Sequence, residues 1–125
     1  MGYYTYFKMN IYKENGEGLL YAESNLYSEV RAKFAEIFTA NYPCKIDSAI
    51  EEAKEFFDTL NDGGDEAKWY DCEKNMSALA KAFPHLQFEL EGQGEEREDW
   101  WMTQFWGDKV EKSYAEIVPP LPHLF

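Results

Sequence analysis

The fold is decided by a stretch near the end of the chain, where residues 86–91 read LQFELE, residues 100–106 read WWMTQFW and residues 110–118 read VEKSYAEIV. Apolar and polar residues alternate in the first segment, and a period of two is typical of a β-strand with one buried face. Gly107-Asp108 separates the last two segments and predicts a two-residue hairpin turn, since glycine suits the first position of a type II′ turn. The sequence therefore predicts three successive antiparallel strands, with a loop over residues 92–96 after the first.

Two further strands and three helices are predicted before these three strands. Alternation and helical spacing of apolar residues place strands over 3–12 and 66–70, and helices over 28–41, 48–62 and 72–83. The order β-α-α-β-α-β-β-β predicts an α+β fold, with a mostly antiparallel sheet of four to five strands and the helices packed on one face.

The composition indicates a single domain over residues 1–125, ending in a proline-rich tail at 119–125. Hydrophobic residues make up 45% of the chain and aromatic residues 18%, which is enough to build a packed core. Cys44 and Cys72 lie far apart and outside any Cys/His cluster, so neither a disulfide framework nor a zinc site is predicted, and a cytoplasmic location is expected. No apolar run approaches the roughly 20 residues that span a bilayer, so a membrane is not expected as a partner.

The charge of the chain is strongly negative, with 24 acidic residues against 12 basic ones and a formal net charge of -12. Direct binding to nucleic acid is disfavoured, because that interaction depends on Lys and Arg side chains that neutralise phosphates. A basic partner is favoured instead. The alternative is that the acidity only maintains solubility.

An acidic stripe follows the second predicted helix. It consists of Asp47, Glu51, Glu52, Glu55, Asp58 and Asp62, which recur at helical intervals opposite the apolar face. Carboxylates four residues apart lie about 6 Å from one another along a helix, so such a row can imitate nucleic acid toward a protein with a basic groove. The alternative is an ordinary solvated helix face, and Lys54 dilutes the row.

A second acidic group surrounds the predicted loop at 92–96. Its members are Glu89, Glu91, Glu95, Glu96, Glu98 and Asp99. The spacing of these acids does not match a calcium-binding loop. The loop glycines Gly92 and Gly94 are not followed by the Gly-Lys-Ser/Thr of a phosphate-binding loop. No metal or cofactor is therefore predicted, and the group is interpreted as an extension of the negative surface.

Catalytic machinery is not apparent. His85 follows a helix-ending proline and His123 lies in the tail, and neither belongs to a recognisable nucleophile–base arrangement. The sequence favours a protein that is not an enzyme.

Aromatic residues are more numerous than a small core needs. Strand alternation places Trp100, Met102 and Trp106 on one face of the sheet and Trp101 and Phe105 on the other. Some aromatics, with Trp101 chosen as an anchor, are expected to form a protein-binding interface rimmed by acids. Burial under the tail or within a homodimer is the open alternative.

Three segments resemble small proteins of bacteriophages, prophages and plasmids that carry a YubB-type ferredoxin-like domain. The segments are MGYYTYFKM at 1–9, AKWYD at 67–71 and FELEGQGEE at 88–96, followed by EDWW at 98–101 and FWGDK at 105–109. The resemblance covers nearly the whole chain and implies a sheet of four or five strands backed by helices. It also implies a mobile genetic element as the setting.

Two hypotheses follow from the charge and the resemblance. The first is an inhibitor that binds a basic host defence protein, such as a CRISPR nuclease, through acidic surface that takes the place of nucleic acid. The second is an accessory module of a mobile element that assembles with itself or with another protein through an exposed aromatic face.

Overall fold

The computed structural model describes residues 4–19, 24–40, 47–94 and 100–114, and it confirms the predicted order of elements. The elements are β1 (Thr5–Tyr12), α1 (Ser24–Phe38), α2 (Asp47–Leu60), β2 (Asp65–Ala67), α3 (Cys72–Ala82), β3 (Gln87–Gln93), β4 (Trp100–Trp106) and β5 (Lys109–Tyr114). Each described helix is too short or too polar to cross a membrane.

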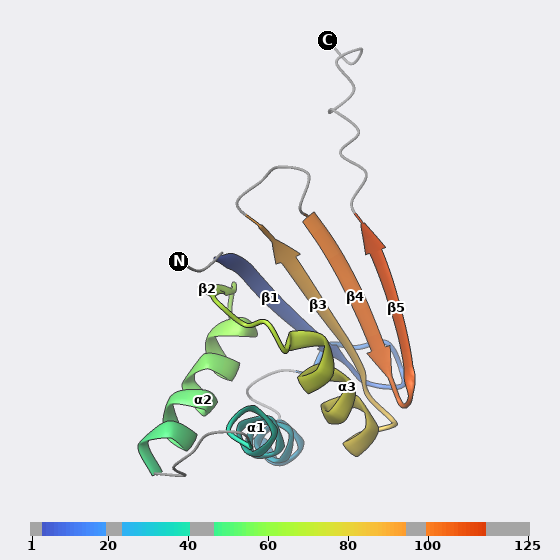
Figure 1. Ribbon diagram of the computed structural model, residues 1–125. Helices are drawn as coiled ribbons and strands as arrows, with labels where there is room; N and C mark the ends of the chain where they lie inside the picture. The colour runs from blue at the N-terminus through green and yellow to red at the C-terminus, as the bar shows by residue number, and fades with distance from the viewer. Residues whose placement is uncertain (1–3, 20–23, 41–46, 95–99, 115–125) are drawn as a thin grey trace.

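The five strands form one antiparallel sheet in the order β2-β1-β3-β4-β5. The three helices lie on one face of this sheet, and β2 and β5 form its two edges (Figure 1). The α+β class, the antiparallel sheet and the one-sided helix layer, a ferredoxin-like type of arrangement, are thus confirmed. Gly107 supplies the predicted turn between β4 and β5 with a φ of 60°.

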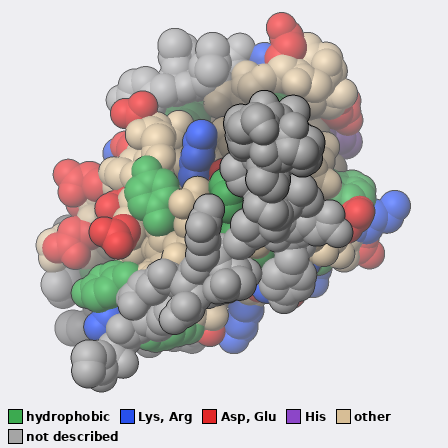
Figure 2. Space-filling model, turned by 90° about the horizontal axis from the view of Figure 1, so that it is seen from above, with side chains coloured by type: hydrophobic (Ala, Val, Ile, Leu, Met, Phe, Trp, Pro, Cys, Tyr) green, Lys and Arg blue, Asp and Glu red, His purple; other side chains and the backbone are tan. Residues whose placement is uncertain are grey.

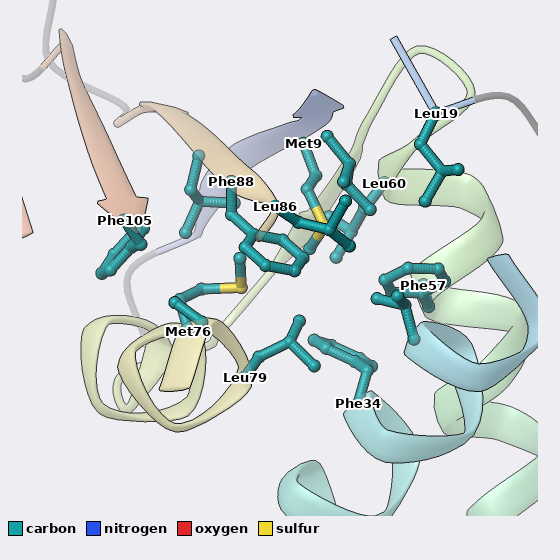
Figure 3. Packing of buried hydrophobic residues seen from close by; sticks show 14 of the residues in the cluster. Met9, Leu19, Phe34, Phe57, Leu60, Met76, Leu79, Leu86, Phe88 and Phe105 are labelled. Carbon is teal, nitrogen blue, oxygen red and sulfur yellow. The ribbon is translucent and has the colours of Figure 1, made fainter. Parts of the chain in front are cut away.

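The core lies between the sheet and the helices because alternate strand residues point toward the helix layer. We call this side of the sheet the helix-covered face; its residues in β1, β3 and β4 are Thr5, Phe7, Met9, Ile11, Phe88, Leu90, Gly92, Trp101, Thr103 and Phe105. Phe34 of α1, Phe57 of α2 and Leu79 of α3 approach it from the helices (Figure 3). Burying a side chain of this size stabilises the fold by about 1.5–3 kcal/mol.

Trp69 packs between the helices and the sheet. Its ring meets Phe7 of β1 and Phe34 of α1 edge-on, with centroid distances of 5.3 and 5.6 Å. Its indole N–H donates a hydrogen bond to Asn75 Oδ1 at 2.8 Å. The predicted strand over 66–70 therefore ends early, at Ala67, because Trp69 is buried among the helices.

Two local expectations differ from the structure. Asp71 stands at the N-cap position of α3, but its side chain makes no capping hydrogen bond. The loop predicted over 92–96 begins later than expected, because Gly92 and Gln93 continue β3 and pair with both β1 and β4.

Candidate functional site

The outer side of α2 is acidic because its inner side supplies the core. Ala53, Phe57 and Leu60 are buried, whereas Glu51, Glu52 and Glu55 are exposed on the opposite side. The prediction of an acidic helix face therefore holds for these three glutamates.

The exposed acids continue beyond the helix into β2. Asp62 lies in the turn after α2, and Asp65 and Glu66 lie in β2; all three are exposed. We name Glu51, Glu52, Glu55, Asp62, Asp65 and Glu66 the α2–β2 acidic surface. Acidic side chains gather on the side of the molecule where α2 and β2 lie (Figure 2).

The glycine pair after α2 holds β2 close to β1 and thereby places these acids. Gly64 has a φ of 102°, and a Cβ there would lie 2.5 Å from the Phe7 carbonyl oxygen and 2.8 Å from the Tyr6 ring. The Tyr6 hydroxyl donates a hydrogen bond to the Gly63 carbonyl. Glycine is required at position 64 because of both the left-handed backbone and this close approach.

Asp58 differs from the other predicted members of the stripe. Its Oδ1 accepts a hydrogen bond from the Tyr27 hydroxyl at 2.8 Å, and its Oδ2 lies 2.9 Å from Arg31 Nη2. Asp58 therefore fastens α2 to α1 and does not project with the stripe, which corrects the prediction. Glu51 is also partly neutralised, since Lys54 Nζ lies 3.4 Å from its Oε2.

Several predicted site residues fall outside the described part of the chain. Asp47 begins α2, but its side chain is not among those described. Glu95, Glu96, Glu98 and Asp99 also lie outside the described residues. Their assignment to a binding surface stays a prediction.

Glu89 and Glu91 lie on the sheet itself. They belong to the side opposite the helices, which we call the open sheet face because no described helix covers it (Figure 1). Its residues in β1, β3, β4 and β5 are Tyr6, Lys8, Asn10, Tyr12, Gln87, Glu89, Glu91, Gln93, Trp100, Met102, Gln104, Trp106, Lys109, Glu111 and Ser113.

Neutral donors hold both carboxylates of the open sheet face. Glu89 Oε1 accepts from Asn10 Nδ2 at 3.3 Å, and Glu89 Oε2 accepts from Gln104 Nε2 at 3.4 Å. Glu91 Oε1 accepts from the Trp100 indole N–H at 3.0 Å. Desolvation, and then the charge of Glu89, raises the pKa of the Tyr12 hydroxyl above its ordinary value.

Trp101 lies on the helix-covered face, where it packs within the fold. Its ring crosses Gly92 so closely that a Cβ there would lie 2.3 Å from Trp101 Cζ2, and Phe7 meets it edge-on at 6.1 Å. Lys112 Nζ lies 4.9 Å from the ring centroid on the other flank. Trp100, its chain neighbour, is the more exposed tryptophan and faces the open side. Alternation predicted opposite faces for the two residues, but the sequence favoured Trp101 as the interface anchor.

Sequence reasoning missed the grouping of Trp100 and Glu91 with Glu89. The available signal was parity, because even-numbered residues of β1 and β4 and odd-numbered residues of β3 share one face. Glu89 and Glu91 were predicted in the strand at 86–91 but were grouped with the acids around the loop at 92–96, since Gly92 was interpreted as a loop residue.

Other reactive groups among the described residues are a histidine and a cysteine, and they do not belong to a cluster suited to a metal. No cluster of three or more His, Cys, Asp or Glu side chains suited to a metal occurs in the described ranges. His85 Nδ1 lies 2.9 Å from Glu14 Oε1 in an exposed pair. Burial raises the pKa of the Cys72 thiol, so this cysteine is a weak nucleophile at neutral pH.

No protein-family model matches the chain, and no curated protein or solved structure shows a significant match to it. The resemblance to phage and plasmid proteins therefore stays a prediction.

Proposed function

We propose that this protein binds a basic, nucleic-acid-binding host protein and inhibits it, because its carboxylates occupy the site at which that protein binds nucleic acid phosphates. The α2–β2 acidic surface carries this proposal. A defence nuclease of the CRISPR type is the partner class, the setting is a phage or mobile element, and the compartment is the cytoplasm. No catalytic step is part of this function.

The physical support is a row of negative charges on rigid elements. Glu52, Glu55 and Asp62 are exposed, and within the described part of the chain no Lys or Arg forms an ion pair with them. Asp58 and Arg31 fix α2 against α1, so the acids of α2 project from a helix whose position is set before binding. Preorganised charge of this kind steers association with a surface of opposite sign.

A cleavage assay with guide-loaded CRISPR nucleases tests the proposal. We expect the protein to inhibit cleavage, inhibition to weaken as salt rises, and target nucleic acid to compete with it. The double variant Glu52→Gln/Glu55→Gln should weaken inhibition by about tenfold, because charges lost at an interface weaken binding directly.

The matched control is Glu29→Gln/Glu36→Gln, which removes the same charge from exposed positions of α1. This control should inhibit almost as well as the unaltered protein. Equal weakening by both double variants, or inhibition that is independent of salt, contradicts mimicry through α2. Absence of inhibition across a panel of such nucleases overturns the choice of partner.

A further inference from the structure

We propose that the open sheet face is a second binding surface, which receives an extended, arginine-bearing segment of a protein. In this site Glu89 and Glu91 accept the cationic head group, and Trp100 and Tyr6 contact its flat or aliphatic part. The site is formed by β1, β3 and β4 and borders the α2–β2 acidic surface at Glu66, the register partner of Tyr6. The inference does not depend on inhibition of a nuclease.

The two carboxylates are oriented but not neutralised. Asn10 and Gln104 are the cross-strand neighbours of Glu89 in β1 and β4, so the sheet register brings one amide to each oxygen. Lys8 is the register partner of Glu91 but forms no ion pair with it in the described structure. Each carboxylate oxygen can accept more than one hydrogen bond, so capacity remains for a charged donor.

An aromatic platform lies directly beside these carboxylates. Tyr6 and Trp100 are the register partners of Gln93 on its two sides, and Gln93 lies two residues after Glu91 on the same face of β3. Their exposed fractions are 37% and 40%, and the hydrogen bond to Glu91 fixes the orientation of the Trp100 ring. A guanidinium that stacks on an aromatic face while donating to a carboxylate combines two favourable contacts.

Charge complementarity selects this occupant over others. The open sheet face carries Glu89, Glu91 and Glu111 against Lys8 and Lys109, on a chain of net charge -12. Nucleic acid would bring further negative charge to this face, despite the aromatic rings. A second copy of the chain would bring the same negative excess. A basic peptide segment is the complementary ligand.

Titration with a labelled peptide of alternating glycine and arginine tests the inference, by fluorescence anisotropy with the full chain at an ionic strength of about 0.1 M. Saturable binding is expected, and Glu89→Gln/Glu91→Gln should weaken it by about tenfold, because charge-assisted hydrogen bonds become neutral ones. Glutamine at position 91 keeps an acceptor oxygen for Trp100, and glutamine at position 89 keeps one of its two, for either Asn10 or Gln104. The sheet is retained because its strands pair through backbone hydrogen bonds. Thermal unfolding of each variant checks this.

The matched control is Glu29→Gln/Glu36→Gln, which changes the net charge equally but lies on α1, outside both proposed surfaces. Its affinity for the peptide should change by less than about twofold, since exposed charges beyond a Debye length of roughly 10 Å are largely screened at ordinary ionic strength. In the unaltered protein, peptide should shift the Trp100 indole resonance in ¹⁵N NMR spectra and leave those of α2 in place.

Three outcomes overturn the proposal. They are the absence of saturable binding, equal weakening by the two double variants, and peptide shifts confined to α2. Concentration-dependent dimers in light scattering that Glu89→Gln/Glu91→Gln abolishes, without a change in peptide affinity, assign the open sheet face to a second copy and also overturn it. Failure of nuclease inhibition leaves each of these readouts unchanged, so the two proposals fail separately.

Discussion

The two faces of the sheet come from the same strands but have different physical roles. On the helix-covered face, Phe88 and Phe105 pair across β3 and β4 and are fully buried. On the open sheet face, the next residues along, Glu89 and Gln104, also pair and are joined by a hydrogen bond. Adjacent residues of one strand thus have different roles: one packs in the core, and the next presents a polar group on the open sheet face.

The role of a residue in this chain therefore depends on the face of the sheet on which it lies, and residue type alone does not assign it. Trp100 and Trp101 are adjacent and identical, yet Trp101 packs across Gly92, whereas Trp100 orients a carboxylate beside exposed surface. Stability should therefore depend on one face and ligand binding on the other.

The largest effect is expected from Phe88→Ala. Phe88 has no exposed surface and packs among residues of the sheet and the helices, so its removal leaves a cavity in the core. The free energy of unfolding should fall by about 3–5 kcal/mol, as measured by urea denaturation. Glu89→Gln, one residue further, should change it by less than about 0.5 kcal/mol. Comparable losses from the two variants would break the distinction between the faces.

The two adjacent tryptophans should differ in effect: replacing Trp101 should mainly lower stability, whereas replacing Trp100 should mainly weaken peptide binding. Trp101→Ala removes the packing on Gly92 and Phe7 and should cost about 2 kcal/mol, less than for a fully buried ring because Trp101 is partly exposed. Trp100→Ala should cost less than about 1 kcal/mol, yet weaken arginine-peptide binding. Urea denaturation and anisotropy measure the two quantities, and a Trp101 variant that alone loses binding would reverse the assignment.

Gly92→Ala tests the close packing on the helix-covered face. The added Cβ would meet two Trp101 ring atoms at 2.3 and 2.4 Å, so the indole must shift, at a cost of about 1–3 kcal/mol. Gly18→Ala is the control, because its nearest neighbour to an added Cβ is the Ile11 carbonyl oxygen at 3.9 Å, an ordinary contact. Unchanged thermal stability in Gly92→Ala would show that Trp101 does not pack across β3.

The smallest effect concerns the Tyr12 hydroxyl on the open sheet face. Its pKa is raised by desolvation first and by Glu89 second, so Glu89→Gln should lower it while leaving it above the ordinary value. A raised pKa means that the stabilising contribution of the neutral hydroxyl is present below the ordinary pKa and is lost as pH rises through the folded value. Tyrosine ¹³Cζ shifts followed with pH measure the change. An identical Tyr12 titration in both proteins would place Glu89 too far away to act.

Much of the fold could be predicted because its signals are local. The element order followed from alternation in LQFELE and WWMTQFW, the Gly107-Asp108 turn and the apolar stripe of α2. The buried sides of LQFELE and α2 were predicted too, whereas WWMTQFW was only divided between two faces. The end of the short strand at Ala67 could not be predicted, since it depends on the burial of Trp69 among α1, α3 and β1.

The candidate surfaces were predicted less completely, because they too depend on contacts between elements that lie far apart in the sequence. Exposure of Glu51, Glu52 and Glu55 follows from helical periodicity alone. The removal of Asp58 from that row depends on Arg31 and Tyr27 of another helix. Gly92 was assigned to a loop because glycine is typical of turns, whereas here it makes room for a tryptophan from the neighbouring strand.

Composition and local periodicity are enough to predict the α+β class, the order of the elements, the strong negative charge and the alternation of residues between two faces of a strand. Which residues contact one another across the fold depends on the tertiary structure. Asn10 and Glu89 are 79 positions apart and form a hydrogen bond because β1 pairs with β3 in one register. No local pattern encodes that register, since it is set by how the helix-covered face packs as a whole.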